Sequence, residues 1–300
     1  MINLYSDTQT RPSDGMRRAI ATADVGDELI LHRTAHPIIA EAGGPAWNAG
    51  LMIHALDGEG GIFTADQVRA AIRPGTRYFP RSRVVSVEQT TNMGGGRVWP
   101  LDAVHDVLDA AREHGLRTHL DGARLMNAVV ASGVSAAEYA GGFDTAWVDF
   151  TKGLGAPVGA VLCGSRALIE EAWRWKQQMG GAFRQSGIVA AGCLYALDHN
   201  VERLAEDHAN ARLLADGLAE LGCDVVAPET NIVIFAAPDI RAIRKHSAEP
   251  SACGFVEAME RHGVELSGAP DGRVRAVTHL DVDRAAVEEA LQTARGVLLA

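Results

Sequence analysis

One lysine, Lys152, stands in a setting that suits amine chemistry. It follows the apolar run at residues 145–150, which is typical of a buried strand, and it opens the glycine-rich stretch KGLGAPVG at residues 152–159. Glycines let the backbone and a bound group approach closely. An amine at a strand end, shielded from water, has its neutral form favoured, and this form adds to carbonyl groups. Lys152 is therefore a candidate catalytic residue.

The elements that must position this lysine are alternating strands and helices. Short apolar runs alternate with helical patterns through the first two thirds of the chain, which is typical of a mainly parallel sheet with helices on both faces. In such sheets ligands bind beyond the carboxyl ends of the strands. Glu88, Asp121 and Lys152 each lie at such an end. We therefore expect these three residues to converge on one site.

The pattern changes after about residue 204. A long helical pattern precedes a mixture of short strands and helices, at residues 188–221, 231–235, 255–262, 274–277 and from Val282 onward. This order predicts a large α/β domain over residues 1–204 and a smaller α+β domain over residues 205–300.

Composition narrows the class of protein. The net charge of −10 and the lack of a basic block argue against nucleic acid as a partner. No apolar stretch is long enough to cross a membrane, and the N-terminus lacks the features of a signal peptide. Four cysteines without a CxxC pair are typical of reduced thiols, so we expect a cytoplasmic enzyme. His32 and His36 have helical spacing, but Pro37 argues against a helical metal site.

Six stretches in order along the chain carry a resemblance to a known family. They are LYSDTxTRP at 4–12, EAGGP at 41–45, HLDGAR at 119–124, KGLGAPVG at 152–159, GGxxRQ at 180–185 and RAVTHL at 275–280. The chain resembles the threonine aldolase and β-eliminating lyase family of pyridoxal 5'-phosphate (PLP) enzymes. The resemblance implies the aspartate aminotransferase fold, a PLP-dependent transferase-like large domain and PLP as the cofactor.

The resemblance also implies which residues bind the cofactor. Lys152 would carry PLP through its amine, and Asp121 would pair with the protonated pyridine nitrogen, which keeps the ring an electron acceptor. His36 matches a histidine that stacks on the ring. Thr151 would lie beside the cofactor, and Arg184 matches a position that reaches the phosphate in the site of a neighbouring subunit.

For the substrate, the resemblance implies a carboxylate site built from Ser6, Arg124 and Arg275. Arg124 would also lie at the cofactor. The planar guanidinium suits this task because it binds a carboxylate with two hydrogen bonds. Thr91 stands where close relatives have a histidine that contacts the β-hydroxyl of the substrate. Threonine is no general base near neutral pH, so water, His36 or another group must take the proton.

A second departure from the family lies near the N-terminus. Relatives have a strand, a helix and a Ser-Gly-Thr loop between the stretch that matches residues 25–27 and the stacking histidine, and that loop binds the cofactor phosphate at a helix N-terminus. Here residues 25–30 lead almost at once to His36. The comparison indicates an internal deletion after Asp27. We therefore expect PLP to be held more weakly than in intact relatives.

The resemblance implies a lyase that cleaves a threonine-like β-hydroxy-α-amino acid to glycine and an aldehyde. Catalysis would depend on Lys152 and His36. Two alternatives stay open: another PLP activity, such as β-elimination or transamination, and an inactive relative that lost its cofactor through the deletion. The family implies a homodimer or homotetramer.

Overall fold

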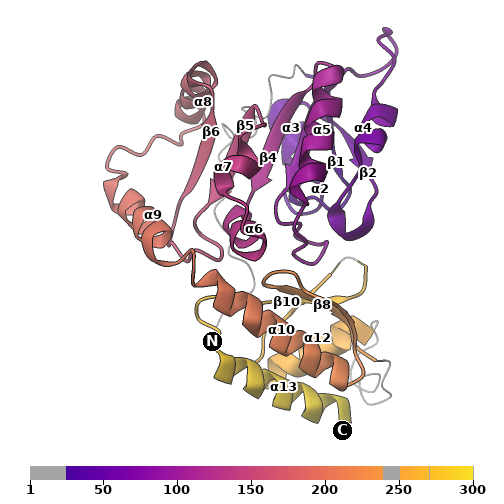
Figure 1. Cartoon of the computed structure of the whole chain (residues 1–300), viewed down its shortest axis with the longest axis vertical. Helices are drawn as coiled ribbons and strands as arrows, with labels where there is room; N and C mark the ends of the chain where they lie inside the picture. The colour runs from indigo at the N-terminus through magenta and orange to yellow at the C-terminus, as the bar shows by residue number, and fades with distance from the viewer. Residues whose placement is uncertain (1–24, 239–250, 270, 300) are drawn as a thin grey trace.

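The computed structural model describes residues 25–238, 251–269 and 271–299, and these residues contain two sheets (Figure 1). The larger sheet has the strand order β2-β1-β3-β4-β5-β6, in which β6 runs antiparallel to β5 and all other pairs are parallel. Its strands are β1 (Glu28–His32), β2 (Met52–Leu56), β3 (Ser82–Glu88), β4 (Arg117–Gly122), β5 (Thr145–Asp149) and β6 (Ala160–Gly164). The expected α/β class with a mainly parallel sheet is confirmed.

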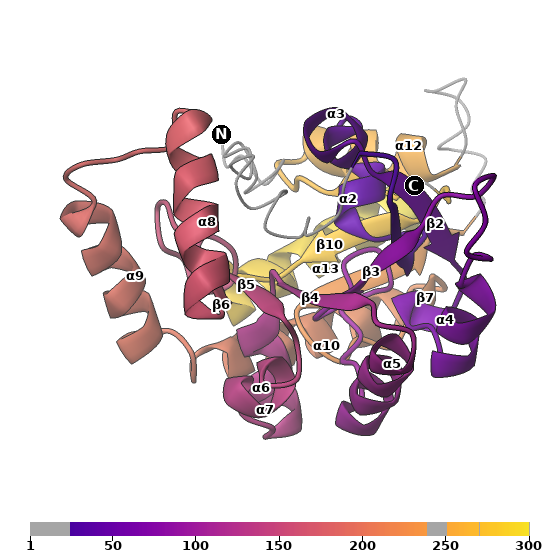
Figure 2. The same ribbon diagram turned by 90° about the horizontal axis from the view of Figure 1, so that it is seen from above.

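Helices cover both faces of the larger sheet because its central strands are apolar on both sides (Figure 2). On β1, Leu29 and Leu31 pack on the face of the sheet that α2 and α3 cover. Ile30 packs on the opposite face, in the core shared with α4 and α5. The helices are α2 (His36–Ile39), α3 (Gly44–Ala49), α4 (Ala65–Ala71), α5 (Leu101–Glu113), α6 (Leu125–Ser132) and α7 (Ala136–Ala140), with a short 3-10 turn, η1, at Glu59–Gly61.

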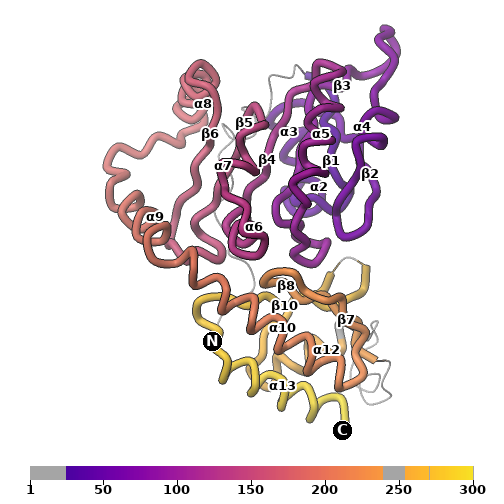
Figure 3. Tube along the Cα trace, viewed as in Figure 1, coloured from indigo at the N-terminus to yellow at the C-terminus, as the bar shows by residue number. Residues whose placement is uncertain are grey.

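The helical pattern expected at residues 188–221 forms two helices, α9 (Gly187–His199) and α10 (Leu204–Glu220). Asn200 ends α9, and its side-chain amide donates a hydrogen bond to the carbonyl oxygen of Leu154, 2.7 Å away. This contact ties the break between the helices to the turn that carries Lys152. Figure 3 shows the chain passing from α9 into α10 and on to the second sheet.

The smaller sheet is antiparallel in the order β7-β8-β10-β9. Its elements are β7 (Asp224–Val226), β8 (Ile232–Ala236), β9 (Ser267–Gly268) and β10 (Val274–Val277), with α10, α12 (Ser251–Arg261) and α13 (Arg284–Leu299) packed on it. Phe235 and Phe255 form an edge-to-face pair in its core, with ring centroids 5.8 Å apart. The domain boundary expected at residues 204 and 205 falls at the start of α10 and stays a prediction.

Hydrogen bonds join the loop after β3 to the smaller sheet. Glu229 accepts from the guanidinium of Arg97 at 2.6 Å and from the backbone N–H of Val98 at 2.7 Å. Thr230 donates its hydroxyl to the carbonyl oxygen of Gly96 at 2.7 Å. The two sheets are therefore linked beside the carboxyl ends of the central strands.

The flank formed by β6, α8 (Arg166–Gln178) and α9 is thinly packed (Figure 1). No residue of α8 is buried, and Ala196 is the single buried residue of α9. Val161 on β6 and Trp173 on α8 are exposed. Among the described residues, β6 has a strand partner on one side alone.

Within the described ranges, none of the helices combines the length and apolar character that crossing a membrane requires.

Candidate active site

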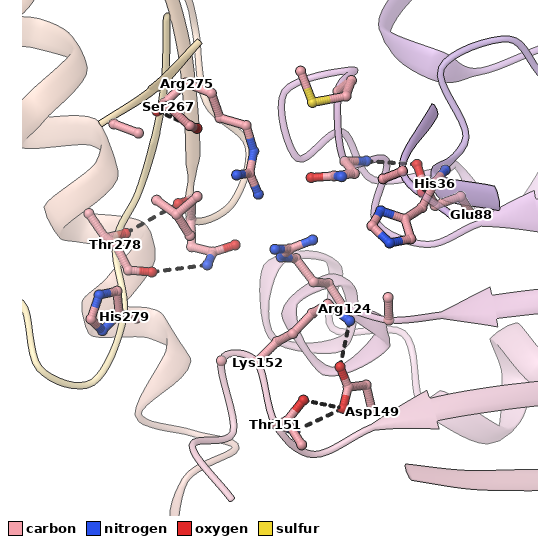
Figure 4. A pocket seen from close by; sticks show the side chains of 18 of the residues that line it. His36, Glu88, Arg124, Asp149, Thr151, Lys152, Ser267, Arg275, Thr278 and His279 are labelled. Carbon is pink, nitrogen blue, oxygen red and sulfur yellow. Dashed lines mark hydrogen bonds and ion pairs between the residues drawn. The ribbon is translucent and has the colours of Figure 1, made fainter. Parts of the chain in front are cut away.

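The carboxyl ends of β3, β4 and β5 meet at one edge of the larger sheet. Glu88 and Asp121 are register partners across β3 and β4, and Asp121 lies opposite Trp147 of β5. Lys152 follows β5 in the next turn. All four side chains line one cavity of about 930 Å³, which residues of β10 and of the start of α13 also line. Figure 4 shows Glu88 and Lys152 at this cavity. The structure therefore brings Glu88, Asp121 and Lys152 together, as the strand pattern predicts.

Lys152 is held by the carboxylate of Asp149, which ends β5 three residues before it. Its Nζ donates to Oδ2 of Asp149 at 2.5 Å and lies 4.9 Å from the centroid of the Trp147 ring. The other carboxylate oxygen, Oδ1, accepts from the backbone N–H and the hydroxyl of Thr151, at 2.9 and 2.7 Å. The lysine side chain is 11% exposed. The sequence predicted the shielding of this amine but not its anionic partner.

Two neighbouring carboxyl groups, those of Glu88 and Asp121, line the cavity. Burial raises the pKa of Asp121 above its ordinary value, although the nearby Lys152 and His36 oppose the shift. Burial and the proximity of Asp121 raise the pKa of Glu88 to about 7. A cation placed against Asp121 would stabilise its ionised form, because burial is the main force against ionisation.

His36 begins α2 and has both its backbone and its ring fixed. Its N–H donates to Oε1 of Glu88 at 3.1 Å, and its ring Nε2 lies 3.0 Å from Oε1 of Glu41. The hydrogen bond with Glu41 raises the pKa of His36 above its ordinary value, against the effect of burial. The ring is therefore oriented at the wall of the cavity.

Two arginines enter the cavity from different sheets (Figure 4). Arg124 precedes α6 at the end of β4, is buried, and has an Nε without a hydrogen-bond partner among the described residues. Arg275 lies on β10 and reaches the cavity from the smaller sheet. Two guanidinium groups in one cavity suit an anionic ligand such as a carboxylate.

Two described residues of the expected site, Thr91 and Arg184, do not line the cavity. Thr91 is fully buried, accepts the N–H of Arg97 at its hydroxyl at 3.2 Å and packs against Gly61, so its side chain points away from the cavity. This geometry differs from the substrate contact expected for it. Arg184 is exposed between α8 and α9. Ser6 lies outside the described residues.

Several cavity residues were not singled out from the sequence. Asn92 donates its backbone N–H to Oε2 of Glu88 at 2.8 Å, and its side-chain oxygen is buried without a partner in the described structure. Asp149 and Glu41 bind the two expected catalytic side chains. Asp149 stands three positions before Lys152 in an otherwise apolar run, a signal that the sequence does contain. In the described ranges, no cluster of three or more His, Cys, Asp or Glu side chains is arranged to hold a metal ion.

Comparison with known proteins identifies the family to which this fold and this cavity belong. A model of the beta-eliminating lyase family matches residues 26–239. A low-specificity L-threonine aldolase of Escherichia coli O157:H7 is 34% identical, over 96% of this chain and 97% of the relative. Threonine aldolase of Leishmania major has a TM-score of 0.79 at 18% identity, over 95% of this chain and 82% of that protein. Aspartate aminotransferase of Thermus thermophilus has a TM-score of 0.69 at 19% identity, over 96% of this chain and 73% of that protein.

The sheet, the smaller domain-like unit and the lysine at the end of β5 define a PLP-dependent transferase-like enzyme fold. The chain belongs to the beta-eliminating lyase family, which includes its threonine aldolase relatives. The resemblance seen in the sequence, its fold and its enzyme class are confirmed. The family and its structural neighbours are PLP-dependent enzymes.

The buried Glu88 predicts a pH dependence of stability. Its pKa in the folded chain, about 7, lies above the ordinary value of 4.5, so the folded state binds the proton more tightly than the unfolded chain. This contribution is complete below pH 4.5 and is lost as the pH rises through 7. Replacing Glu88 by Gln should therefore reduce the fall in unfolding free energy between pH 5 and 8, by up to about 3 kcal/mol.

Urea denaturation at each pH measures this difference. The exposed Glu113, whose pKa is lowered by its contact with Arg69, provides a matched control as Glu113→Gln. An identical pH profile for wild type and Glu88→Gln would contradict the prediction.

Proposed function

We propose that the protein is a PLP-dependent lyase of the threonine aldolase type, which cleaves a β-hydroxy-α-amino acid to glycine and an aldehyde. The observation that carries this proposal is the meeting of Lys152, Asp121 and two arginines in one cavity. The E. coli relative described above is a low-specificity L-threonine aldolase, and it is 34% identical over nearly all of both chains.

The cavity residues fit the reactive part of PLP. When bound, PLP supplies a carbonyl that joins amines and a ring that accepts electrons from a breaking bond. The Lys152 amine would hold the carbonyl, and the buried Asp121 carboxylate would face the ring nitrogen. His36, fixed by Glu41, would lie on the ring face, with Thr151 beside it.

The remaining polar residues suit an amino-acid substrate. Arg124 and Arg275 would hold its α-carboxylate between the two sheets, and the Nε of Arg124, which has no partner among the described residues, offers a donor for it. Thr91 does not line the cavity, and threonine is no general base near neutral pH. His36 and Glu88 line the cavity; the hydrogen bond with Glu41 raises the pKa of His36, and burial raises the pKa of Glu88 to about 7, so either suits that task.

An absorbance and product assay tests this function. Adding PLP should produce an absorbance band that Lys152→Ala loses, and the loaded protein should release aldehyde and glycine from a threonine-like substrate. Ammonia or a keto acid as the product would assign β-elimination or transamination instead. Absence of aldehyde from every β-hydroxy amino acid tried would reject the lyase.

We also propose that the chain lacks the family's phosphate-binding unit. The alignment with the E. coli relative runs over 337 positions but uses 96% of these 300 residues, so the relative has about 50 residues without a counterpart here. The uncovered flank of β6, α8 and α9 is consistent with the loss of a neighbouring strand and helix.

Cofactor retention should show this loss directly. Equilibrium dialysis should give a dissociation constant for PLP above the micromolar range. Pyridoxal, which has no phosphate, should bind within about tenfold of PLP, because the described cavity retains its ring contacts. Submicromolar PLP binding, with pyridoxal bound far more weakly, would show that a phosphate site exists.

We propose that the protein is a homodimer or homotetramer that buries the flank of α8 and α9. The exposed side chains there include Trp173, Phe183, Ile188 and Tyr195. Exposed apolar groups gathered in one region are typical of an interface. Arg184, in the same segment, would then reach the cavity of the neighbouring subunit. The cytoplasmic location and the absence of nucleic-acid partners stay predictions.

Analytical ultracentrifugation of a charged variant tests the interface. Ile188→Glu should shift the protein toward the monomer, because Ile188 is 85% exposed on α9 and would be buried on association. Tyr78→Glu is the control, since Tyr78 is 76% exposed between α4 and β3. Equal masses for wild type and Ile188→Glu would exclude this surface.

A further inference from the structure

The carboxylate of Asp149 is oriented independently of the lysine that it contacts. Both donors of Thr151, the backbone N–H and the hydroxyl, bind Oδ1 and leave Oδ2 facing the cavity. Asp149 ends β5 and its side chain is 5% exposed. A carboxylate fixed in this way and shielded from water binds a cation more strongly than a mobile surface carboxylate does.

Lys152 has two carboxylates within electrostatic range. Its charge lowers the pKa of Asp121, against the effect of burial, whereas Asp149 adds to the shift upward. The hydrogen bond, however, goes to Asp149. The contact therefore holds the ammonium group on the β5 side of the cavity and leaves the Asp121 carboxyl open to the cavity.

The other groups around Asp149 do not compete with Lys152 for its carboxylate. Trp147, on the same strand, offers the lysine its ring face. Cys193 approaches from α9, where burial and then the charge of Asp149 raise the pKa of its thiol, so the thiol stays neutral. Among the described residues, Lys152 is the cation that Asp149 bonds.

We propose that Asp149 is a positioning residue that acts as the counter-ion of the Lys152 ammonium group whenever this lysine carries no cofactor. The inference rests on the proposed role of Lys152. It assigns the two carboxylates to different tasks: Asp149 serves the lysine, and Asp121 stays available for the cofactor ring.

This role matters when an incoming amino acid displaces the lysine. The Lys152 nitrogen would take up as many protons as the α-ammonium group of the substrate gives up, so the exchange as a whole would neither release nor consume a proton. Asp149 then accepts the hydrogen bond of the new ammonium group. This contact would keep the released lysine on the β5 side of the cavity.

The sequence offers a direct assay because it contains three lysines, Lys152, Lys176 and Lys245. Acetic anhydride at limiting concentration acylates neutral amines, and peptide mass spectrometry then gives the rate at each lysine. Lys176 is the internal reference, since its Nζ lies 4.7 Å from the Trp173 ring, like Lys152 over Trp147. The full-length protein is labelled without added cofactor.

Replacing Asp149 by Asn should raise the labelling of Lys152 relative to Lys176 by about tenfold, because the amine loses its counter-ion while its access stays similar. Asp121→Asn should raise the ratio by less. Asp109→Asn removes the matching i,i+3 partner of Arg112 on the surface of α5 and should leave the ratio unchanged. Glu at position 149 keeps the charge, so Asp149→Glu should give a smaller rise than Asn.

A ratio in Asp149→Asn within about twofold of wild type would overturn the proposal, as would a larger rise in Asp121→Asn. If Asp149→Asn does not fold, Thr151→Val can replace it, because this change removes one of the hydrogen bonds that orient Asp149. It should still raise the labelling ratio, and an unchanged ratio would contradict the proposal. The labelling needs no PLP, so its result stands whether or not the protein binds the cofactor or cleaves a substrate.

Discussion

The parallel pairing of β3, β4 and β5 is the constraint on which the site depends. In-register parallel strands end at the same edge, so Glu88, Asp121 and the turn after Asp149 are neighbours although they are far apart in the chain. Burial of this edge disfavours charged groups, so a charged side chain there needs a partner of opposite charge. Glu41 binds His36, and Asp149 binds Lys152. Each of these two side chains therefore has a carboxylate partner at the cavity wall.

Much of this arrangement follows from the sequence. Apolar runs ending in Glu88, Asp121 and Lys152 locate the strand ends, and the strand-helix alternation predicts their convergence. Where the pattern was insufficient, the cause was local geometry. The helix expected over residues 188–221 breaks at Asn200, whose side chain bonds the turn after Lys152 instead of continuing the pattern. The periodicity of apolar residues does not record such a contact.

Side-chain direction in loops was the least predictable property. Thr91 was expected at the substrate, but its hydroxyl satisfies the backbone of Arg97 and leaves Asn92 to face the cavity. A shift of one residue in an irregular loop reverses which side chain is exposed to a ligand, and no periodic pattern sets it. The sequence shows Asp149 as a lone carboxylate in an apolar strand. Its partner, Lys152, became identifiable only from the geometry of the turn that follows β5.

The cavity has one consequence for the choice of ligand. Arg124 belongs to the larger sheet and Arg275 to the smaller one, and hydrogen bonds from Glu229 and Thr230 join the two beside the cavity. An anion held by both guanidinium groups would bridge the two sheets. A ligand without a carboxylate would not form this bridge, so the pair of arginines would discriminate amino acids from simple amines.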